Sequence, residues 1–262
     1  MSKWLEALVM TRPPKLLHAL LPGCEWTVAS ATSSTPVIYL TFDDGPIPDE
    51  TPWVLEQLAQ FNARATFFCV GDNVARYPEI ARAALAAGHR LGNHTQHHRS
   101  AWQTTRTEYL EEVAACNRTL QVVLGDDKVL GIGYSVSGQE YPPPNTQPLI
   151  PNPEYPTPSP QSQIPAPHSL AKLLFRPPYG RLTRALIREL KLDYRVIMWS
   201  VLTRDYDPDL APEKCLRQTL AAVRPGDIVV FHDSRKASAR LRYVLPRMLA
   251  HFAGRGFRFE AL

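Results

Sequence analysis

The sequence predicts an α/β fold in which parallel strands form a sheet or a barrel. From Val37 onward, short apolar runs alternate with amphipathic stretches, which is the pattern of repeated βα units. The 262 residues are 44% hydrophobic and 21% charged, so the chain can bury the core of one large domain. Four polar motifs each follow an apolar run, and parallel α/β folds gather catalytic groups at the carboxyl ends of their strands.

The first half of the chain predicts three strands and three helices. The strands are the short apolar runs 37–44, 65–70 and 89–93. The helices are the amphipathic stretches 51–61, 77–87 and 105–124. One face of the first helix holds its apolar residues, Val54, Leu55, Leu58 and Phe61. Gly88 closes the second helix, since glycine adopts a left-handed conformation at least cost.

The second half continues the pattern after a long interruption. Strands are predicted over 173–176, 195–201, 227–233 and 257–262, and helices over 182–190, 212–223 and a stretch that ends near 253. Between about 126 and 170 the composition changes, with eleven prolines from Pro142 to Pro167. Such a segment cannot be a helix or strand interior. We expect an extended surface insert, with a substrate-side lid or a partner-docking segment as the alternatives.

The chain is expected to have two parts, an N-terminal segment over 1–34 that packs on the barrel and a barrel domain over 35–262. The net charge of +4 is spread along the chain, which argues against a nucleic-acid partner. The start lacks an export signal, and no run reaches the ~18 to 20 apolar residues of a spanning helix. We expect a cytoplasmic or inner-membrane-associated protein, with 15–21 either docked on the domain or in weak contact with a membrane surface.

The first two motifs predict a metal site. Asp43 and Asp44 end a strand ahead of a Gly-Pro pair, where both carboxylates can turn toward one site, one as a cation ligand and the other as a base. His94 and His98 lie four residues apart after the next-but-one strand, a spacing that suits two nitrogen ligands. His97 should point away from the site. A plain turn is the alternative for the Asp-Asp-Gly-Pro motif.

The other two motifs predict groups that act on a reacting substrate. Arg176 ends a strand and can pair with a carboxylate. The two prolines that follow it fix the backbone, so the N–H of Tyr179 can donate to a developing oxyanion. His232 ends an apolar strand, and its unperturbed pKa near neutrality suits a general acid. A structural turn and a capped strand end are the alternatives.

The ordered motifs T-F-D-D-G-P, H-T-x-x-H, R-P-P-Y-G and V-F-H-D resemble those of the polysaccharide deacetylases with a NodB-type homology domain, carbohydrate esterase family four. The resemblance runs from about residue 35 to 262, apart from the insert. It implies a distorted (β/α) barrel with fewer than eight full units. It also implies removal of N-acetyl groups from an N-acetylated sugar polymer or oligomer, with a divalent metal, usually Zn²⁺ and often replaceable by Co²⁺, held by Asp44, His94 and His98.

The resemblance assigns the remaining roles as well. Asp43 is expected to be the catalytic base, and Arg176 to position it. The Tyr179 amide is expected to help stabilise the oxyanion, and His232 to be the general acid. The residues expected to contact the sugar are Tyr179, Trp199, Asp205 and Tyr206.

One segment departs from the family pattern. Leu202 stands where the fourth motif often has an aspartate, and Tyr206 stands where it often has a tryptophan. The missing carboxylate would pair with the general acid and raise its pKa. We therefore expect His232 to be either less basic or tuned by another group such as Asp205, with some activity retained. Tyr206 still provides an aromatic wall for a sugar ring.

Three other functions compete with this hypothesis. Relatives of the fold include amide hydrolases of small cyclic imides or ureides, which need a closed pocket rather than an open groove. An O-acetyl esterase acting on xylan is the second alternative. A catalytically silent carbohydrate-binding module is the third, and the intact base, ligands and acid argue against it. Among N-acetylated substrates, peptidoglycan-like and chitin-like polymers both fit the motifs.

Overall fold

The computed structural model describes residues 10–29, 35–124 and 172–262. The predicted proline-rich insert therefore lies outside the described residues. In the described part, nine strands form one sheet in the order β1-β6-β5-β4-β3-β2-β8-β7, and β9 also pairs with β2. All of these pairings are parallel.

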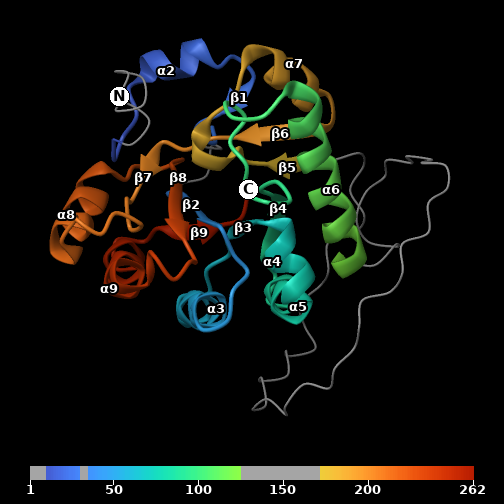
Figure 1. Cartoon of the computed structure of the whole chain (residues 1–262). Coiled ribbons are helices and arrows are strands. Elements are labelled where there is room, and N and C mark those ends of the chain that lie inside the picture. The colour runs from blue at the N-terminus through green and yellow to red at the C-terminus, as the bar shows by residue number, and fades with distance from the viewer. Residues whose placement is uncertain (1–9, 30–34, 125–171) are drawn as a thin grey trace. The chain divides into compact units, whose positions relative to one another are not determined.

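The strands are β1 (Cys24–Glu25), β2 (Val37–Asp43), β3 (Thr66–Cys69), β4 (Arg90–Asn93), β5 (Leu173–Phe175), β6 (Tyr194–Ile197), β7 (Val201–Leu202), β8 (Ile228–His232) and β9 (Arg258–Glu260). The helices are α2 (Lys15–Leu20), α3 (Glu50–Gln60), α4 (Gly71–Arg76), α5 (Pro78–Ala86), α6 (Arg106–Leu124), α7 (Arg184–Asp193), α8 (Pro212–Ala222) and α9 (Ser238–Ala253), with a 3₁₀ turn, η1, at Pro178–Gly180. Figure 1 shows these helices around the outside of the sheet.

The predicted single strand over 195–201 is wrong, and the difference reveals how the sheet curls. β6 pairs with β5 near one end of the sheet, whereas β7 pairs with β8 at the other. The amide of Met198 donates to the carbonyl of Glu25 in β1, and that of Ser200 donates to Ile228 in β8. Met198 and Ser200, only two residues apart, thus bond to strands near opposite ends of the sheet. The sheet must therefore curl on itself, and it forms an incomplete, distorted barrel. This confirms the predicted fold class.

β2 lies at the centre of the fold because it pairs with β3 and β8 along its length. Its alternate side chains Ile38, Leu40 and Phe42 are fully buried in the core cluster that includes residues of α3, α5 and α9. The ring of Phe42 stacks on those of the neighbouring strands, with its centroid 5.0 Å from Phe67 and 5.8 Å from Phe231. Truncating Phe42 to alanine should cost about 3–5 kcal/mol of folding free energy.

The other set of alternate side chains on β2 faces the inside of the barrel. Thr41 and Asp43 belong to this set, and both are buried. In the sheet register, Asp43 lies opposite His232 on β8. On the other side, Cys69 at the end of β3 lies opposite Asn93 at the end of β4. The carboxyl ends of these strands therefore meet at one edge, where the four sequence motifs follow them.

The other predicted helices and strands occur within a few residues of their expected bounds. Sequence patterns did not predict α2, β1, α4 or η1, which are short. β1 adds a parallel edge to the sheet, with Cys24 opposite Val196 of β6. Leu17 of α2 is buried in a cluster with Trp26 and Met198. Within the described residues, no helix has the length and apolar character needed to cross a membrane.

Candidate active site and metal centre

A pocket of about 400 Å³ opens at the carboxyl ends of the strands. All four sequence motifs contribute to its lining. The predicted catalytic and metal-binding residues among the lining are Asp43, Asp44, His94, His98, Tyr179 and His232. Motifs that are up to about 190 residues apart in the sequence therefore meet in one place, as the parallel topology predicted.

The predicted metal ligands have a geometry that fits a divalent cation. One ligand atom from each of Asp44, His94 and His98 lies within 4.8 Å of the others. The Asp44 Oδ1 atom is 3.3 Å from Nε2 of His98 and 3.8 Å from Nε2 of His94. Ligands about 2.1 Å from a shared zinc ion lie roughly 3–3.5 Å apart, so small side-chain shifts suffice to bind one.

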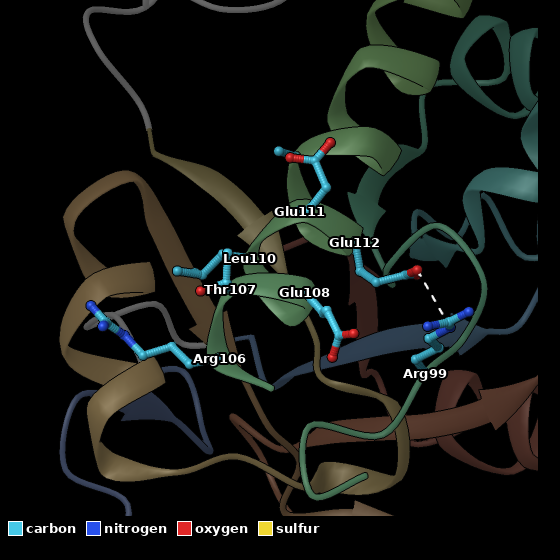
Figure 2. A pocket seen from close by; sticks show the side chains of 8 residues that line it. Arg99, Arg106, Thr107, Glu108, Leu110, Glu111 and Glu112 are labelled. Atoms are coloured by element: carbon cyan, nitrogen blue, oxygen red, sulfur yellow. Dashed lines mark ion pairs between the residues drawn. The ribbon is translucent and has the colours of Figure 1, made fainter. Parts of the chain in front are cut away.

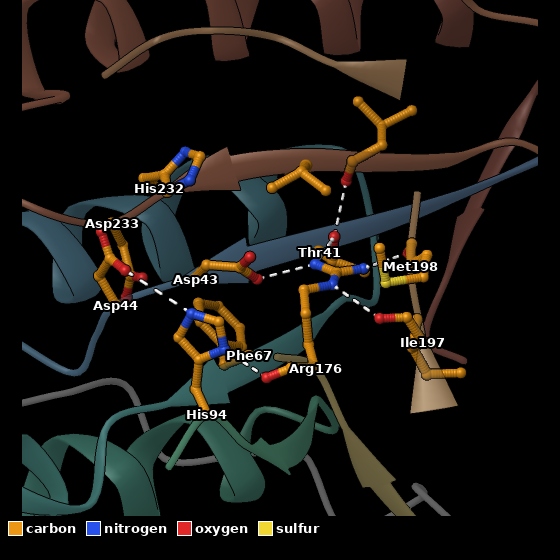
Figure 3. Close-up of polar contacts among 12 residues, drawn as sticks. Thr41, Asp43, Asp44, Phe67, His94, Arg176, Ile197, Met198, His232 and Asp233 are labelled. Carbon is orange, nitrogen blue, oxygen red and sulfur yellow. Dashed lines mark hydrogen bonds and ion pairs between the residues drawn. The ribbon is translucent and has the colours of Figure 1, made fainter. Parts of the chain in front are cut away.

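The tautomer and the charge state of His94 also suit a metal ligand. Its Nδ1 atom lies 2.7 Å from the carbonyl oxygen of Arg176, and because a carbonyl can only accept, Nδ1 donates. The proton on Nδ1 leaves the lone pair of Nε2 directed at Asp44 (Figure 3). Burial lowers the pKa of His94 to about 4, with the charge of Asp43 opposing this shift. His94 is therefore neutral near pH 7.

The carboxylate of Asp44 stays ionised beside these imidazoles. Burial alone would raise the pKa of Asp44, but the hydrogen bond from His98 and the charge of His232 are the largest effects that oppose burial and hold it below its usual value. The backbone of Asp44 is left-handed, with φ at 84°, and that of His98 is left-handed at 56°. Such conformations are uncommon outside glycine and cluster at functional sites.

A buried aspartate that the sequence analysis did not single out fixes the turn of Asp44. Oδ1 of Asp233 accepts a hydrogen bond of 3.1 Å from the amide of Gly45, and Oδ2 lies 2.6 Å from the hydroxyl of Thr51. A Cβ atom on Gly45 would come within 2.0 Å of the same carboxyl. A larger residue at 45 would therefore displace this carboxyl. Burial raises the pKa of Asp233 to about 8.

The expected pairing of Arg176 with Asp43 occurs inside the barrel. Nη1 of Arg176 donates to Oδ1 of Asp43 and to the hydroxyl of Thr41, each at 2.7 Å, and Nη2 donates to the carbonyl of Met198 at 2.9 Å (Figure 3). The Arg176 side chain is fully buried, and its guanidinium lies 4.2 Å from the ring centroid of Phe68. Burial lowers the pKa of Arg176, and the charge of Asp43 opposes the shift. One oxygen of Asp43 is therefore held in a fixed orientation.

His232 has a carboxylate partner, although Leu202 stands at the position where one was expected. Nδ1 of His232 donates to Oδ1 of Asp205 at 2.8 Å, and the backbone amide of His232 donates to Oδ2 at 2.8 Å. Burial would lower the pKa of His232, but the charge and hydrogen bond of Asp205 outweigh it and raise the pKa to about 9. The expectation of a less basic His232 is thus wrong, and the alternative, tuning by Asp205, is supported.

This arrangement corrects the assignment of Asp205 as a sugar contact. Asp205 is fully buried and both of its carboxylate oxygens bond to His232. Trp199, Leu202 and Tyr206 do line the pocket. The ring of Tyr206 meets that of His232 edge-on, at a centroid distance of 4.9 Å. The indole N–H of Trp199 has no hydrogen-bond acceptor within the described residues.

Tyr179 lies in η1 with a left-handed backbone, at a φ of 60°. The amides of Gly180 and Arg181 donate to the carbonyls of Pro177 and Pro178. The amide of Tyr179 has no acceptor in the part of the chain that the structure describes, so it remains available as a donor. Its ring is 55% exposed and meets that of the metal-ligand candidate His98 edge-on, at 4.8 Å.

His97 points away from the ligand set, as expected, with Nδ1 2.7 Å from Oε1 of Glu112.

A second depression, of about 760 Å³, lies over the first turns of α6 (Figure 2). Its lining includes Glu112, which pairs with Arg99 at 3.6 Å, and Arg106, which pairs with Glu189 outside it. None of the residues from the four motifs lines this depression, so it is not a candidate active site.

Comparisons with known proteins show what the chain is similar to. Residues 30–137 match the family model described as polysaccharide deacetylase. A chitooligosaccharide deacetylase from Bradyrhizobium sp. is 31% identical over 202 residues, which are 77% of this chain and 72% of the relative. A peptidoglycan-N-acetylglucosamine deacetylase from Bacillus cereus is 26% identical over 246 residues, covering 93% and 94%.

The fold is also similar to that of a solved structure. A crystal structure of a peptidoglycan N-acetylglucosamine deacetylase superposes with a TM-score of 0.67 over 94% of this chain and 93% of that one, at 21% identity. This likeness concerns the fold alone, whereas the sequence relatives span most of both chains. The chain therefore belongs to the polysaccharide deacetylase family.

Proposed function

We propose that the chain is a metal-dependent hydrolase that removes N-acetyl groups from N-acetylated oligo- or polysaccharides and releases acetate. The observation that supports this function best is the meeting of Asp43, His232 and the Asp44-His94-His98 set in one pocket. Relatives described as chitooligosaccharide and peptidoglycan-N-acetylglucosamine deacetylases support the substrate class.

The ligand set suits Zn²⁺, because two imidazoles and one carboxylate leave further positions open. Co²⁺ accepts the same donors. When bound, such a cation lowers the pKa of water and polarises the acetamide carbonyl. The chain contributes the orientation of the ligands. The carbonyl of Arg176 fixes the His94 tautomer, and Asp233 holds the turn that presents Asp44.

Hydrolysis of an acetamide also needs a base for the attacking water, donors for the developing oxyanion and an acid for the leaving amine. We assign the base to Asp43, because Arg176 holds one of its oxygens and leaves the other for the water proton. The unpaired amide of Tyr179 is suited to donate to the oxyanion. His232 is the acid, because Asp205 fixes Nδ1–H and keeps the ring protonated near pH 7.

The exposure of the ligands favours a sugar chain over a small cyclic imide. The side chains of Asp44 and His98 are each 28% exposed, so the pocket of this chain is open to solvent. An enzyme for a small imide would need these groups to be enclosed. We propose that Trp199, Tyr206 and Tyr179 contact the sugar, since each lines the pocket and aromatic rings pack well on pyranose faces.

The expected location in the cytoplasm or at the inner membrane stays a prediction. α2 presents Leu16, which is 70% exposed, next to Lys15. This pair supports weak contact with an anionic membrane surface. Co-flotation of the protein with phosphatidylglycerol vesicles, compared with neutral vesicles, tests the contact.

The experiment that tests the function is acetate release from chitin oligomers, peptidoglycan fragments and acetylated xylan, with Zn²⁺ or Co²⁺ and with chelator. Release from an N-acetylated substrate that stops with chelator supports the proposal and gives the substrate class. Release from xylan alone would instead support the O-acetyl esterase. No release from any of them, by protein that binds one metal ion, would refute the proposal.

A further inference from the structure

Two cationic side chains line the pocket, and the proposed chemistry uses neither. They are Arg181, which follows η1, and Lys236, which lies between β8 and α9. Within the described residues, neither side chain forms an ion pair or a hydrogen bond, although most other arginines near the site do. Their charges are therefore free to meet a ligand.

The guanidinium of Arg181 is held in place by aromatic rings rather than by an acid. Its central carbon lies 5.2 Å from the ring centroid of Trp102 and 5.3 Å from that of Tyr179. Trp102 is itself fixed, because its indole N–H donates to the carbonyl of Leu182 at 3.3 Å. The Nε–H of Arg181 is buried and has no acceptor among the described residues, a state that costs free energy.

Lys236 approaches the pocket from a different loop, the one between β8 and α9. Its Nζ atom lies 5.6 Å from the ring centroid of Tyr206, whose edge meets His232. Lys236 is exposed, and its charge is weakened by solvent more than that of Arg181. We therefore expect Arg181 to have the larger effect on a ligand and Lys236 the smaller one.

The carboxylates around the pocket do not neutralise these cations. Asp43 is paired with Arg176, and Asp205 is paired with His232. Asp44 belongs to the metal ligand set. A neutral acetamido sugar presents only hydroxyl and amide groups, which need no free guanidinium. A carboxylate or phosphate, in contrast, matches the planar donors of an arginine and gains a charge-assisted hydrogen bond.

We propose that Arg181, assisted by Lys236, makes this enzyme select substrates in which the N-acetylated sugar bears or adjoins an acidic group, a carboxylate or a phosphate. The inference rests on the proposed deacetylase function and adds the substrate's charge to it. Arg181 is a specificity-determining residue in this proposal, and it takes no part in the proton transfers.

The test compares three N-acetylglucosamine oligomers of equal length on the metal-loaded full chain. One is neutral, one has a carboxylate on an ether-linked side group, and one has a phosphate at its reducing end. We expect the wild type to favour one or both acidic oligomers, and the two arms show which anion is recognised. Arg181→Gln should lower kcat/KM for the favoured oligomer roughly ten- to hundredfold, and for the neutral one by at most about threefold.

A matched control separates local contact from net charge. Arg188 on α7 is exposed and does not line the pocket, so Arg188→Gln removes the same charge elsewhere. It should leave the ratio of acidic to neutral kcat/KM unchanged. Arg181→Lys should restore part of the preference, and added salt should weaken it.

Two results would overturn the inference. One is a wild type with no preference for either acidic oligomer, and the other is an equal loss on acidic and neutral oligomers in Arg181→Gln. Calorimetric binding of the same oligomers to chelator-treated protein gives a readout that does not need turnover. If no oligomer is deacetylated but Arg181→Gln still weakens binding of the acidic one, the deacetylase proposal fails while Arg181 keeps its role.

Discussion

Replacing Asp205 with asparagine should lower the pKa of His232 and reduce stability in a pH-dependent way. Asparagine keeps the size of the side chain and one acceptor oxygen but removes the charge. In the wild type, Asp205 is fully buried and meets both Nδ1 and the amide of His232 at 2.8 Å. Its charge and hydrogen bond overcome burial and raise the pKa of His232 from 6.5 to about 9.

The size of the effect follows from this difference. Each pKa unit corresponds to about 1.4 kcal/mol, so a pKa of about 9 against 6.5 represents roughly 3 kcal/mol of stabilisation. Because the folded-state pKa of His232 is raised, this stabilisation is complete below pH 6.5 and is lost as the pH rises through 9. Asp205→Asn keeps the burial that Asp205 offsets, so it should be at least about 3 kcal/mol less stable than wild type at pH 6, and the gap should shrink toward pH 9.

The assay is urea denaturation at several pH values together with an NMR titration of His232. Both use metal-free protein, because a bound dication would also lower the pKa of this imidazolium. Asp207→Asn is the matched control, since Asp207 lies on the same loop and pairs with Arg204 instead. A stability gap that stays constant from pH 6 to 9, or an unchanged pKa of His232, would refute the reasoning.

Three further predictions concern the rest of the site. His94→Ala should abolish uptake of one equivalent of Zn²⁺ with an unchanged circular dichroism spectrum; a variant that still binds one equivalent would exclude His94 as a ligand. Arg176→Met leaves the buried Asp43 charge unpaired, so urea denaturation should show a loss of about 3–5 kcal/mol, and a loss below about 1 kcal/mol would contradict the buried pair. Gly45→Ala places a Cβ atom 2.0 Å from the Asp233 carboxyl and should destabilise by about 1–3 kcal/mol while weakening Zn²⁺ binding, as calorimetry would measure. Unchanged affinity would show that this turn does not orient Asp44.

The sequence was sufficient to predict the fold class, because apolar periodicity and the motifs at strand ends can be recognised from residues that are close together in the sequence. It failed at residues 195–201, where one apolar run forms two strands. An apolar run shows that residues are buried, but it does not show which neighbours they bond to. That choice depends on the curl of the sheet, which places Met198 beside β1 and Ser200 beside β8.

The same limit explains the partner of His232. Sequence reasoning identified a missing carboxylate at Leu202, but the loop after β7 brings Asp205 to the imidazole instead. Residue type was predictable, whereas the direction of a loop side chain was not. Asp233 directly follows His232 in a motif that was recognised, yet its bonds to Gly45 and Thr51 depend on long-range contacts. The aromatic rings that hold Arg181 likewise come from separate segments.

The most direct test of a metal-dependent deacetylase is a Zn²⁺ titration of the chelator-treated protein, with acetate release from a chitin oligomer measured at each step. Activity should be absent at the start, rise with added Zn²⁺ and reach a plateau at one equivalent, because Asp44, His94 and His98 form one ligand set. His94→Ala should show no rise. Acetate release at the full rate before any Zn²⁺ is added, or an equal rise in His94→Ala, would contradict the assignment of these residues as the metal centre.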